Sequence, residues 1–123
     1  MERGTITIKG KDVVINAPHN EIWIRQHELA DLFQCFVSKI NANVRAILKS
    51  GVLDETKVCR TYYYKNGNSV EQYNLEMIVA LSFRIRSYNA DAFREFIVTK
   101  ATADTSTKQI LIYSDWNQNA MLN

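Results

Sequence analysis

Residues 29–48 read LADLFQCFVSKINANVRAIL, and this stretch constrains the fold more than any other part of the chain. Leu29, Leu32 and Phe33 follow the i, i+3, i+4 spacing of an amphipathic helix. The same period resumes almost at once, at Val37. Two helices joined by so short a break predict either a helix-turn-helix, whose second helix enters DNA, or an ordinary helical hairpin that fills a core.

The second predicted helix, about residues 37–50, has two unlike faces. Ile40, Val44 and Ile47 fall on one side, and Gly51 is placed to end the helix. The other side and its flanks carry small, polar and basic residues, which suit contact with base edges and phosphates. A recognition helix here would contact DNA through Ser38, Lys39, Asn41, Ala42, Arg45 and Lys49.

Strand patterns precede these helices. Residues 5–9 and 13–17 are rich in β-branched side chains and surround a turn-prone Gly-Lys-Asp sequence, which predicts an N-terminal β-hairpin. A short strand is expected at residues 21–24, before the helical period begins.

A second hairpin is predicted over residues 58–73, where two β-prone runs surround Asn66-Gly67. Asn-Gly is typical of a two-residue type I′ turn, and such a loop would place Tyr63 opposite Val70. Tyrosines occur on both faces, so the pattern leaves the buried face open. As the wing of a helix-turn-helix domain, this hairpin would offer Lys65 and Asn66 to the DNA backbone.

The C-terminal part of the chain divides into core helices and a tail. Residues 75–87 and 90–101 carry apolar side chains at helical spacing and should pack into the core. Residues 102–123 change to a polar, asparagine-rich composition, which leaves open an edge strand, a dimer arm or disorder. We therefore expect one domain over residues 1–101. Its expected fold class is α+β: a winged helix-turn-helix-like domain with an N-terminal β-hairpin, a wing hairpin and two C-terminal core helices.

Composition and charge narrow the class of protein. With 123 residues, 46% of them hydrophobic, the chain can bury one core but has no room for two ordinary domains. The sequence has neither a signal-peptide pattern nor a membrane-spanning apolar run, which predicts a cytoplasmic protein. The net charge is +2, yet residues 32–70 hold six bases and two acids, a local net charge of +4. Positive charge is thus concentrated around the two predicted helices.

Catalytic and metal-binding patterns are missing from the sequence. Cys35 and Cys59 have no CxxC-type partner, and we expect buried free thiols. His19 and His27 are expected at the surface, because neither belongs to a nucleophile–base pair or a set of metal ligands. No enzyme activity, metal, cofactor, small-molecule ligand or membrane partner is therefore expected.

Three blocks of the sequence resemble the N-terminal region of the RhuM family of bacterial virulence-associated proteins. They are IWIRQHELADLF at residues 22–33, GVLDETKVC at 51–59 and VEQYNLEMIVALSFRIRS at 70–87. The resemblance covers about the first hundred residues, and family members continue much further. It implies a DNA-binding domain associated with mobile elements or virulence, and it supplies no catalytic residues.

These observations favour a protein that binds double-stranded DNA, such as a transcriptional regulator. A homodimer is expected, because such proteins usually pair over two half-sites about one DNA turn apart. The alternative is a protein–protein interaction module on the same scaffold, which would use its tyrosine-rich hairpin and apolar tail.

Overall fold

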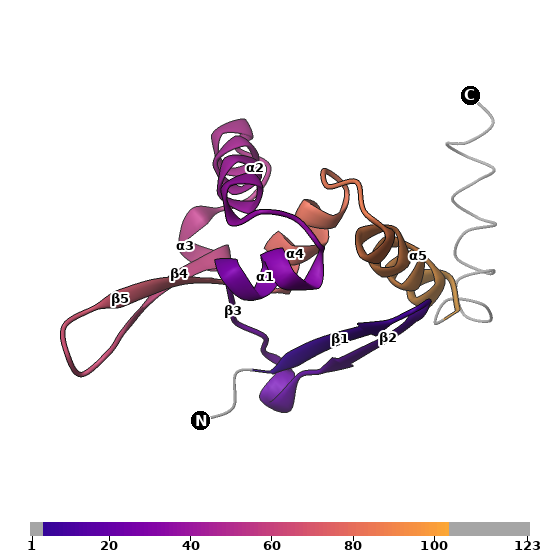
Figure 1. Ribbon diagram of the computed structural model, residues 1–123, viewed down its shortest axis with the longest axis horizontal. Helices are drawn as coiled ribbons and strands as arrows, with labels where there is room; N and C mark the ends of the chain where they lie inside the picture. Colours follow the sequence, from indigo (N-terminus) through magenta and orange to yellow (C-terminus); the bar gives the residue numbers. More distant parts are fainter. Residues whose placement is uncertain (1–3, 104–123) are drawn as a thin grey trace, which may run out of the picture.

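The computed structural model describes residues 4–103, which begin with a β-hairpin (Figure 1). Strand β1 (Thr5–Lys9) pairs antiparallel with β2 (Asp12–Asn16). Gly10 forms part of the connection with a φ of 60°, in the left-handed region that glycine adopts readily. The predicted hairpin is present, with its second strand shifted by one residue.

Strand β3 (Ile24–Arg25) is shorter than the predicted strand and lies later in the chain. The residues before it form a 3-10 turn, η1 (Pro18–Asn20), in which His19 and Asn20 have φ values of 60° and 62°. The backbone is extended again at Glu21, but pairing with β5 begins only at Ile24.

Helices α1 (Gln26–Leu32) and α2 (Val37–Ser50) follow, as the periodicity predicts. The short turn between them contains Gln34 at a φ of 58°, an unusual value for a residue other than glycine. Gly51 ends α2 at a φ of 78°, and its N–H donates to the Leu48 carbonyl. The expected pair of helices joined by a short turn is therefore present.

The second hairpin is present, but its predicted two-residue turn is wrong. A short helix, α3 (Glu55–Val58), leads into β4 (Cys59–Tyr63), which pairs antiparallel with β5 (Ser69–Tyr73). Tyr63 lies opposite Ser69 and not opposite Val70. The Tyr64 N–H donates to the Asn68 carbonyl at 2.7 Å, which leaves a three-residue loop, and Gly67 takes its left-handed position at a φ of 91°.

In residues 4–103 the strands form two separate antiparallel sheets, β1-β2 and β3-β5-β4. The second sheet joins a strand that precedes α1 to a hairpin that follows α3, and β5 lies in its middle. Only the base of the hairpin is buried: Gln72 and Tyr73 are 2% and 3% exposed, whereas residues 60–69 are exposed. The rest of the hairpin extends away from the body of the molecule (Figure 1).

Helix α4 (Leu75–Ser82) ends before the predicted boundary, and α5 (Tyr88–Ala103) starts earlier and ends later. The Arg94 side chain donates to the carbonyl oxygens of Ser82 and Ile85. Ser82 is the last residue of α4 and Ile85 lies in the loop after it. The bond to Arg94 gives the Ser82 carbonyl the partner that a further helical turn would have supplied. The Ser87 hydroxyl oxygen accepts from the Ala90 N–H at 3.0 Å, which fixes the start of α5.

One core joins the helices to both sheets. Phe33 of the interhelical turn and Phe93 of α5 are fully buried and meet edge to face, with ring centroids 5.7 Å apart. Around them lie apolar side chains that are also fully buried: Leu29, Ile40, Met77, Ile78 and Leu81. The fold is therefore α+β, as expected. The first two residues of the predicted tail, 102–123, belong to α5, and the tail from residue 104 onward lies outside the described residues.

Among residues 4–103, none of the helices combines the length and the apolar composition needed to cross a bilayer.

Candidate nucleic-acid interface

Helix α2 separates an apolar face from a solvent-facing one. Ile40, Val44 and Ile47 are 0–4% exposed and pack into the core. Each residue turns the helix by about 100°, so residues three or four positions apart lie on the same face. By this spacing Arg45 and Lys49 share the face opposite the apolar one. The predicted contact residues Ser38, Lys39, Ala42, Arg45 and Lys49 are all exposed.

Asn41, also a predicted contact, is half-buried and has a partner within the protein. Its side-chain oxygen accepts a hydrogen bond of 3.2 Å from the Gln26 amide, which also donates to the Tyr73 hydroxyl at 2.6 Å. Gln26 begins α1 and Tyr73 ends β5, so this pair of bonds links both helices to the sheet. In this structure Asn41 helps to orient α2.

Asn43 lies on the other flank of α2, where it meets a residue from the loop after α4. Its side-chain oxygen accepts from Arg84 Nε at 2.8 Å, and its amide donates to the Lys39 carbonyl at 2.9 Å. Arg84 is absent from the predicted contacts, because the pattern placed residue 84 inside a helix. No local signal in the sequence pairs it with Asn43.

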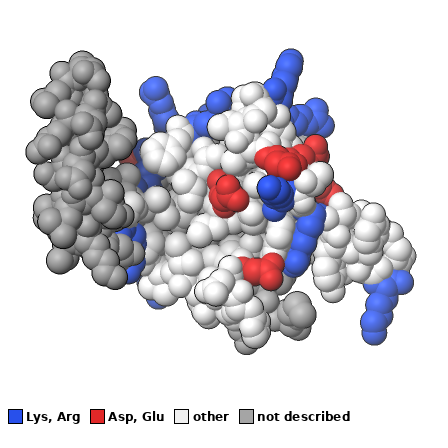
Figure 2. Space-filling view, turned by 180° about the vertical axis from the view of Figure 1, so that it is seen from behind, with Lys and Arg blue, Asp and Glu red and all other residues white. Residues whose placement is uncertain are grey.

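The tip of the second hairpin presents both of its predicted contacts to solvent. Lys65 and Asn66 are exposed, and the Asn66 side-chain oxygen accepts from the Asn68 N–H at 2.9 Å. Asn66 therefore shapes the loop, while Lys65 contributes the charge. Figure 2 shows Lys and Arg side chains at the upper edge of the molecule, around α2, and at the end of the projecting hairpin.

Arg25 fastens the hairpin to the start of α1. Its Nη1 donates to the Tyr64 hydroxyl at 3.1 Å, and its Nε donates to Glu28 at 3.1 Å. The hydrogen bonds to Glu28 and Tyr64 raise the pKa of the Arg25 guanidinium. The hairpin is thus attached both through strand pairing at its base and through a side chain near its far end.

The segments that carry these cations contain no acid. Residues 32–53 include Lys39, Arg45 and Lys49, and residues 77–90 include Arg84 and Arg86, with neither Asp nor Glu in either segment. Because the Asn43–Arg84 bond joins the two segments, their positive charges reinforce each other. The acids Asp54 and Glu55 directly follow the first segment.

No protein-family model, curated protein or solved structure matches this chain. Function is therefore inferred from the geometry of α2 and its neighbours, together with the sequence pattern. In the part of the chain that the structure describes, no three His, Cys, Asp or Glu side chains are grouped to hold a metal ion.

Exposed aromatic side chains form a second notable feature. Phe36, directly before α2, is 84% exposed, and the hairpin residues Tyr62, Tyr63 and Tyr64 are 48%, 72% and 39% exposed. The rings of Tyr62 and Tyr64 meet edge to face at 5.2 Å. The composition indicates the tyrosines, whereas the helical pattern gives no sign that Phe36 is exposed. Aromatic groups of this kind are enriched in macromolecular interfaces.

The two cysteines are free, as expected, but they are half-buried and not buried. Partial burial, with Glu55 and Glu71 nearby, raises the pKa of the Cys59 thiol to about 11. Burial also raises the pKa of Cys35. Both thiols are therefore poor nucleophiles near neutral pH, because the thiolate is the reactive form.

Proposed function

We propose that the protein binds double-stranded DNA and inserts the exposed face of α2 into the major groove. The observation that carries this proposal is the division of α2 into two faces. Ile40, Val44 and Ile47 anchor it in the core, while Arg45 and Lys49 lie exposed on the opposite side. The major groove admits a helix, and exposed Arg and Lys side chains can reach guanine edges or phosphates.

The arrangement of the second sheet supports a winged helix-turn-helix. In that fold, a strand before the two helices joins the hairpin that follows them, and the last hairpin strand lies in the middle. The order β3-β5-β4, with α1 and α2 between β3 and β4, has this form. The hairpin then corresponds to the wing, and Lys65 at its tip is suited to contact the DNA backbone.

The sequence resemblance to the RhuM family supports the same proposal and suggests the biological setting. It favours a cytoplasmic DNA-binding regulator associated with mobile elements or virulence. Because one helix in one groove supplies limited specific contact, the proposal includes a homodimer that spans two half-sites about one DNA turn apart.

The test measures binding to a mixed-sequence duplex by fluorescence anisotropy, from about 50 to 200 mM salt, since phosphate contacts release counterions. The double substitution Arg45→Ala and Lys49→Ala removes two cations from the exposed face of α2. If both contact phosphates, the slope of log affinity against log salt should fall by about 2. If one contacts a base, affinity should fall by about 1 to 3 kcal/mol at every salt concentration.

A matched control removes the same charge elsewhere. Lys9 and Lys11 lie at the connection of β1 and β2, on the far side of the molecule from α2 (Figure 1). Replacing both with alanine should leave affinity and slope close to those of the unaltered protein. Equal effects of the two double substitutions would mean that DNA responds to net charge alone. No effect of the α2 substitutions would exclude α2 as the contact element.

The second candidate function is a protein–protein interaction module, favoured by the exposed tyrosines of the hairpin. Tyrosine combines a large apolar surface with a hydroxyl group and is enriched at interfaces. This function predicts weak, nonspecific DNA binding and a protein partner whose affinity changes little with salt. Replacing Tyr62 and Tyr63 with serine would then abolish partner binding, whereas the α2 substitutions would not affect it.

A further inference from the structure

Arg84 is held beside α2 even though it is 41 positions away from its partner in the chain. Its Nε donates to the Asn43 side-chain oxygen at 2.8 Å. Asn43 is itself fixed, because its amide donates to the Lys39 carbonyl of the same helix. The bond to Asn43 does not engage the two Nη groups, which carry the remaining donors of the guanidinium.

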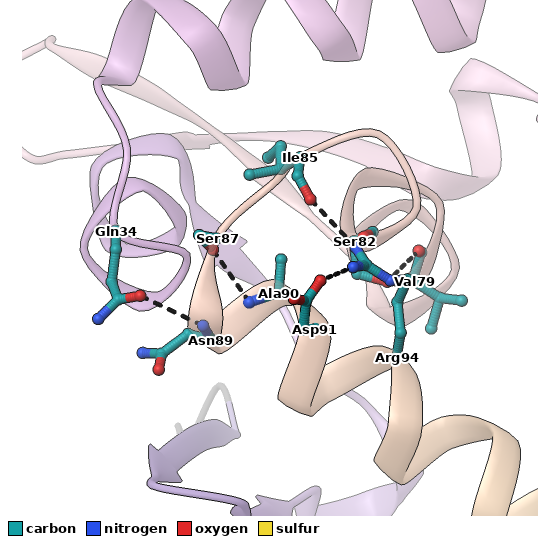
Figure 3. Close-up of polar contacts among 9 residues, drawn as sticks. All are labelled: Gln34, Val79, Ser82, Ile85, Ser87, Asn89, Ala90, Asp91 and Arg94. Atoms are coloured by element: carbon teal, nitrogen blue, oxygen red, sulfur yellow. Dashed lines mark hydrogen bonds and ion pairs between the residues drawn. The ribbon is translucent and has the colours of Figure 1, made fainter.

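The loop that carries Arg84, residues 83–87, is fastened at both ends. Ile85, in its middle, is 1% exposed, and Arg94 Nη1 donates to the Ile85 carbonyl at 3.0 Å. Figure 3 shows Arg94 reaching from α5 toward Ile85 and Ser82, with Ser87 bonded to Ala90 at the other end of the loop. The buried side chain and these bonds give the loop a defined position.

Asn89, in the first turn of α5 just after the loop, is bonded to the end of α1 and to the turn that follows it. Its side chain donates to the Leu32 carbonyl at 2.8 Å. Its N–H donates to the Gln34 side-chain oxygen at 3.2 Å (Figure 3). These bonds fix the start of α5, and with it the C-terminal end of the loop, relative to α1 and the turn before α2. Arg84 therefore has its position relative to α2 set before any ligand binds.

The loop and the second hairpin lie on opposite sides of α2 (Figure 1). Asn41 and Asn43 are two positions apart, which corresponds to about 200° around the helix. Asn41 contacts Gln26, which bonds to Tyr73 at the base of the hairpin, and Asn43 contacts Arg84. A helix in the major groove runs between two phosphate backbones about 12 Å apart. With α2 in the groove, the hairpin would face one of these backbones and the loop would face the other.

We propose that the loop of residues 83–87 is a third DNA-contacting element, in which Arg84 binds a backbone phosphate on the wall opposite the hairpin. This inference rests on the proposed insertion of α2 into the major groove. Arg86 is also exposed and adds positive charge to the same loop. Contacts on both walls would fix how far α2 enters the groove and in which direction it lies, because phosphate contacts set orientation.

Three variants test this assignment on the same mixed-sequence duplex. Arg84→Ala should reduce the salt slope by about 0.9, so that affinity falls about 3.5-fold less between about 50 and 200 mM salt. Arg84→Lys should restore the slope, since a lysine ammonium also binds phosphate. Asn43→Ala keeps the charge and removes its anchor, so it should weaken binding while the slope is retained. Lys11→Ala, at the distant β1-β2 turn, is the control and should change neither quantity.

The outcomes separate this inference from the proposed function. If Arg84→Ala leaves the slope unchanged while the Arg45 and Lys49 substitutions lower it, the loop does not contact DNA and α2 remains the binding element. If Lys11→Ala lowers the slope as much as Arg84→Ala, the effect reflects net charge and the inference is wrong. If the unaltered protein shows no salt-dependent binding to duplex DNA, both proposals are overturned.

Discussion

Replacing Gln26 with leucine should lower the free energy of unfolding by about 1 to 2 kcal/mol, because a buried hydroxyl loses its donor. The Gln26 amide donates to the Tyr73 hydroxyl at 2.6 Å, and Tyr73 is 3% exposed. Burial also raises the pKa of Tyr73, which agrees with a poorly hydrated hydroxyl. Gln26 itself is half-buried, so water can offset part of the loss, and we expect the lower part of the range of about 1 to 3 kcal/mol for stranded groups.

A double-mutant cycle isolates the contribution of this hydrogen bond. Tyr73→Phe removes the acceptor and should cost about 0.5 to 1.5 kcal/mol. In the double variant, no hydroxyl is left without a donor. Its loss of stability should therefore be smaller than the sum of the two single losses, by about 1 kcal/mol.

Urea denaturation followed by circular dichroism measures these differences, and each kcal/mol should also shift the melting temperature by about 4 to 8 °C. The control is Thr61→Ala in the same sheet. The Thr61 hydroxyl donates to Glu71 at the same distance, 2.6 Å, but both residues are exposed. Its loss should cost less than about 0.5 kcal/mol. Additive effects of Gln26→Leu and Tyr73→Phe, within about 0.5 kcal/mol, would refute the claim that this bond joins α1 to the sheet.

Two further predictions concern the backbone and the thiols. Gly51→Ala should cost about 1 kcal/mol, because a Cβ at this glycine meets no atom within 4 Å apart from those of its chain neighbours, and its φ of 78° is the source of strain. Gly51→Asn should cost less in the same denaturation assay, and an equal cost would contradict this reasoning. In a Cys35→Ser variant, Cys59 should react with iodoacetamide at pH 8 far more slowly than an unstructured cysteine peptide. The rate should rise as the pH approaches the Cys59 pKa of about 11, and a peptide-like rate at pH 8 would show that this thiol is not shielded.

The sequence by itself determined the elements whose cause is local. The bounds of α2 follow from the apolar period of residues 37–48 and from Gly51, which is suited to the left-handed backbone that ends a helix. The same period determines which face of α2 is buried, and hence that Arg45 and Lys49 are exposed. The N-terminal hairpin also follows from its β-branched runs around a glycine turn.

The tertiary structure decided the features that depend on distant partners. The hairpin register is one exception with a local cause: it differs from the predicted register by one residue because Gly67 occupies the left-handed position of a three-residue loop, and an Asn-Gly pair suits either loop length. Helix α4 stops at Ser82, where Arg94 from the following helix bonds to the Ser82 carbonyl and to that of Ile85 in the loop beyond it. The periodicity of a sequence shows only how apolar side chains are spaced along one helix. It cannot show that a guanidinium from another helix bonds to the end of that helix.

The candidate site also has features that the sequence predicts and features that depend on tertiary contacts. Its exposed cations on α2 could be predicted, because the helical period alone separates them from the core. The use of Asn41 to hold α1, and the placement of Arg84 against Asn43, could not be. Each depends on which polar group packing brings within about 3 Å of another, and that distance is set by the path of the whole chain.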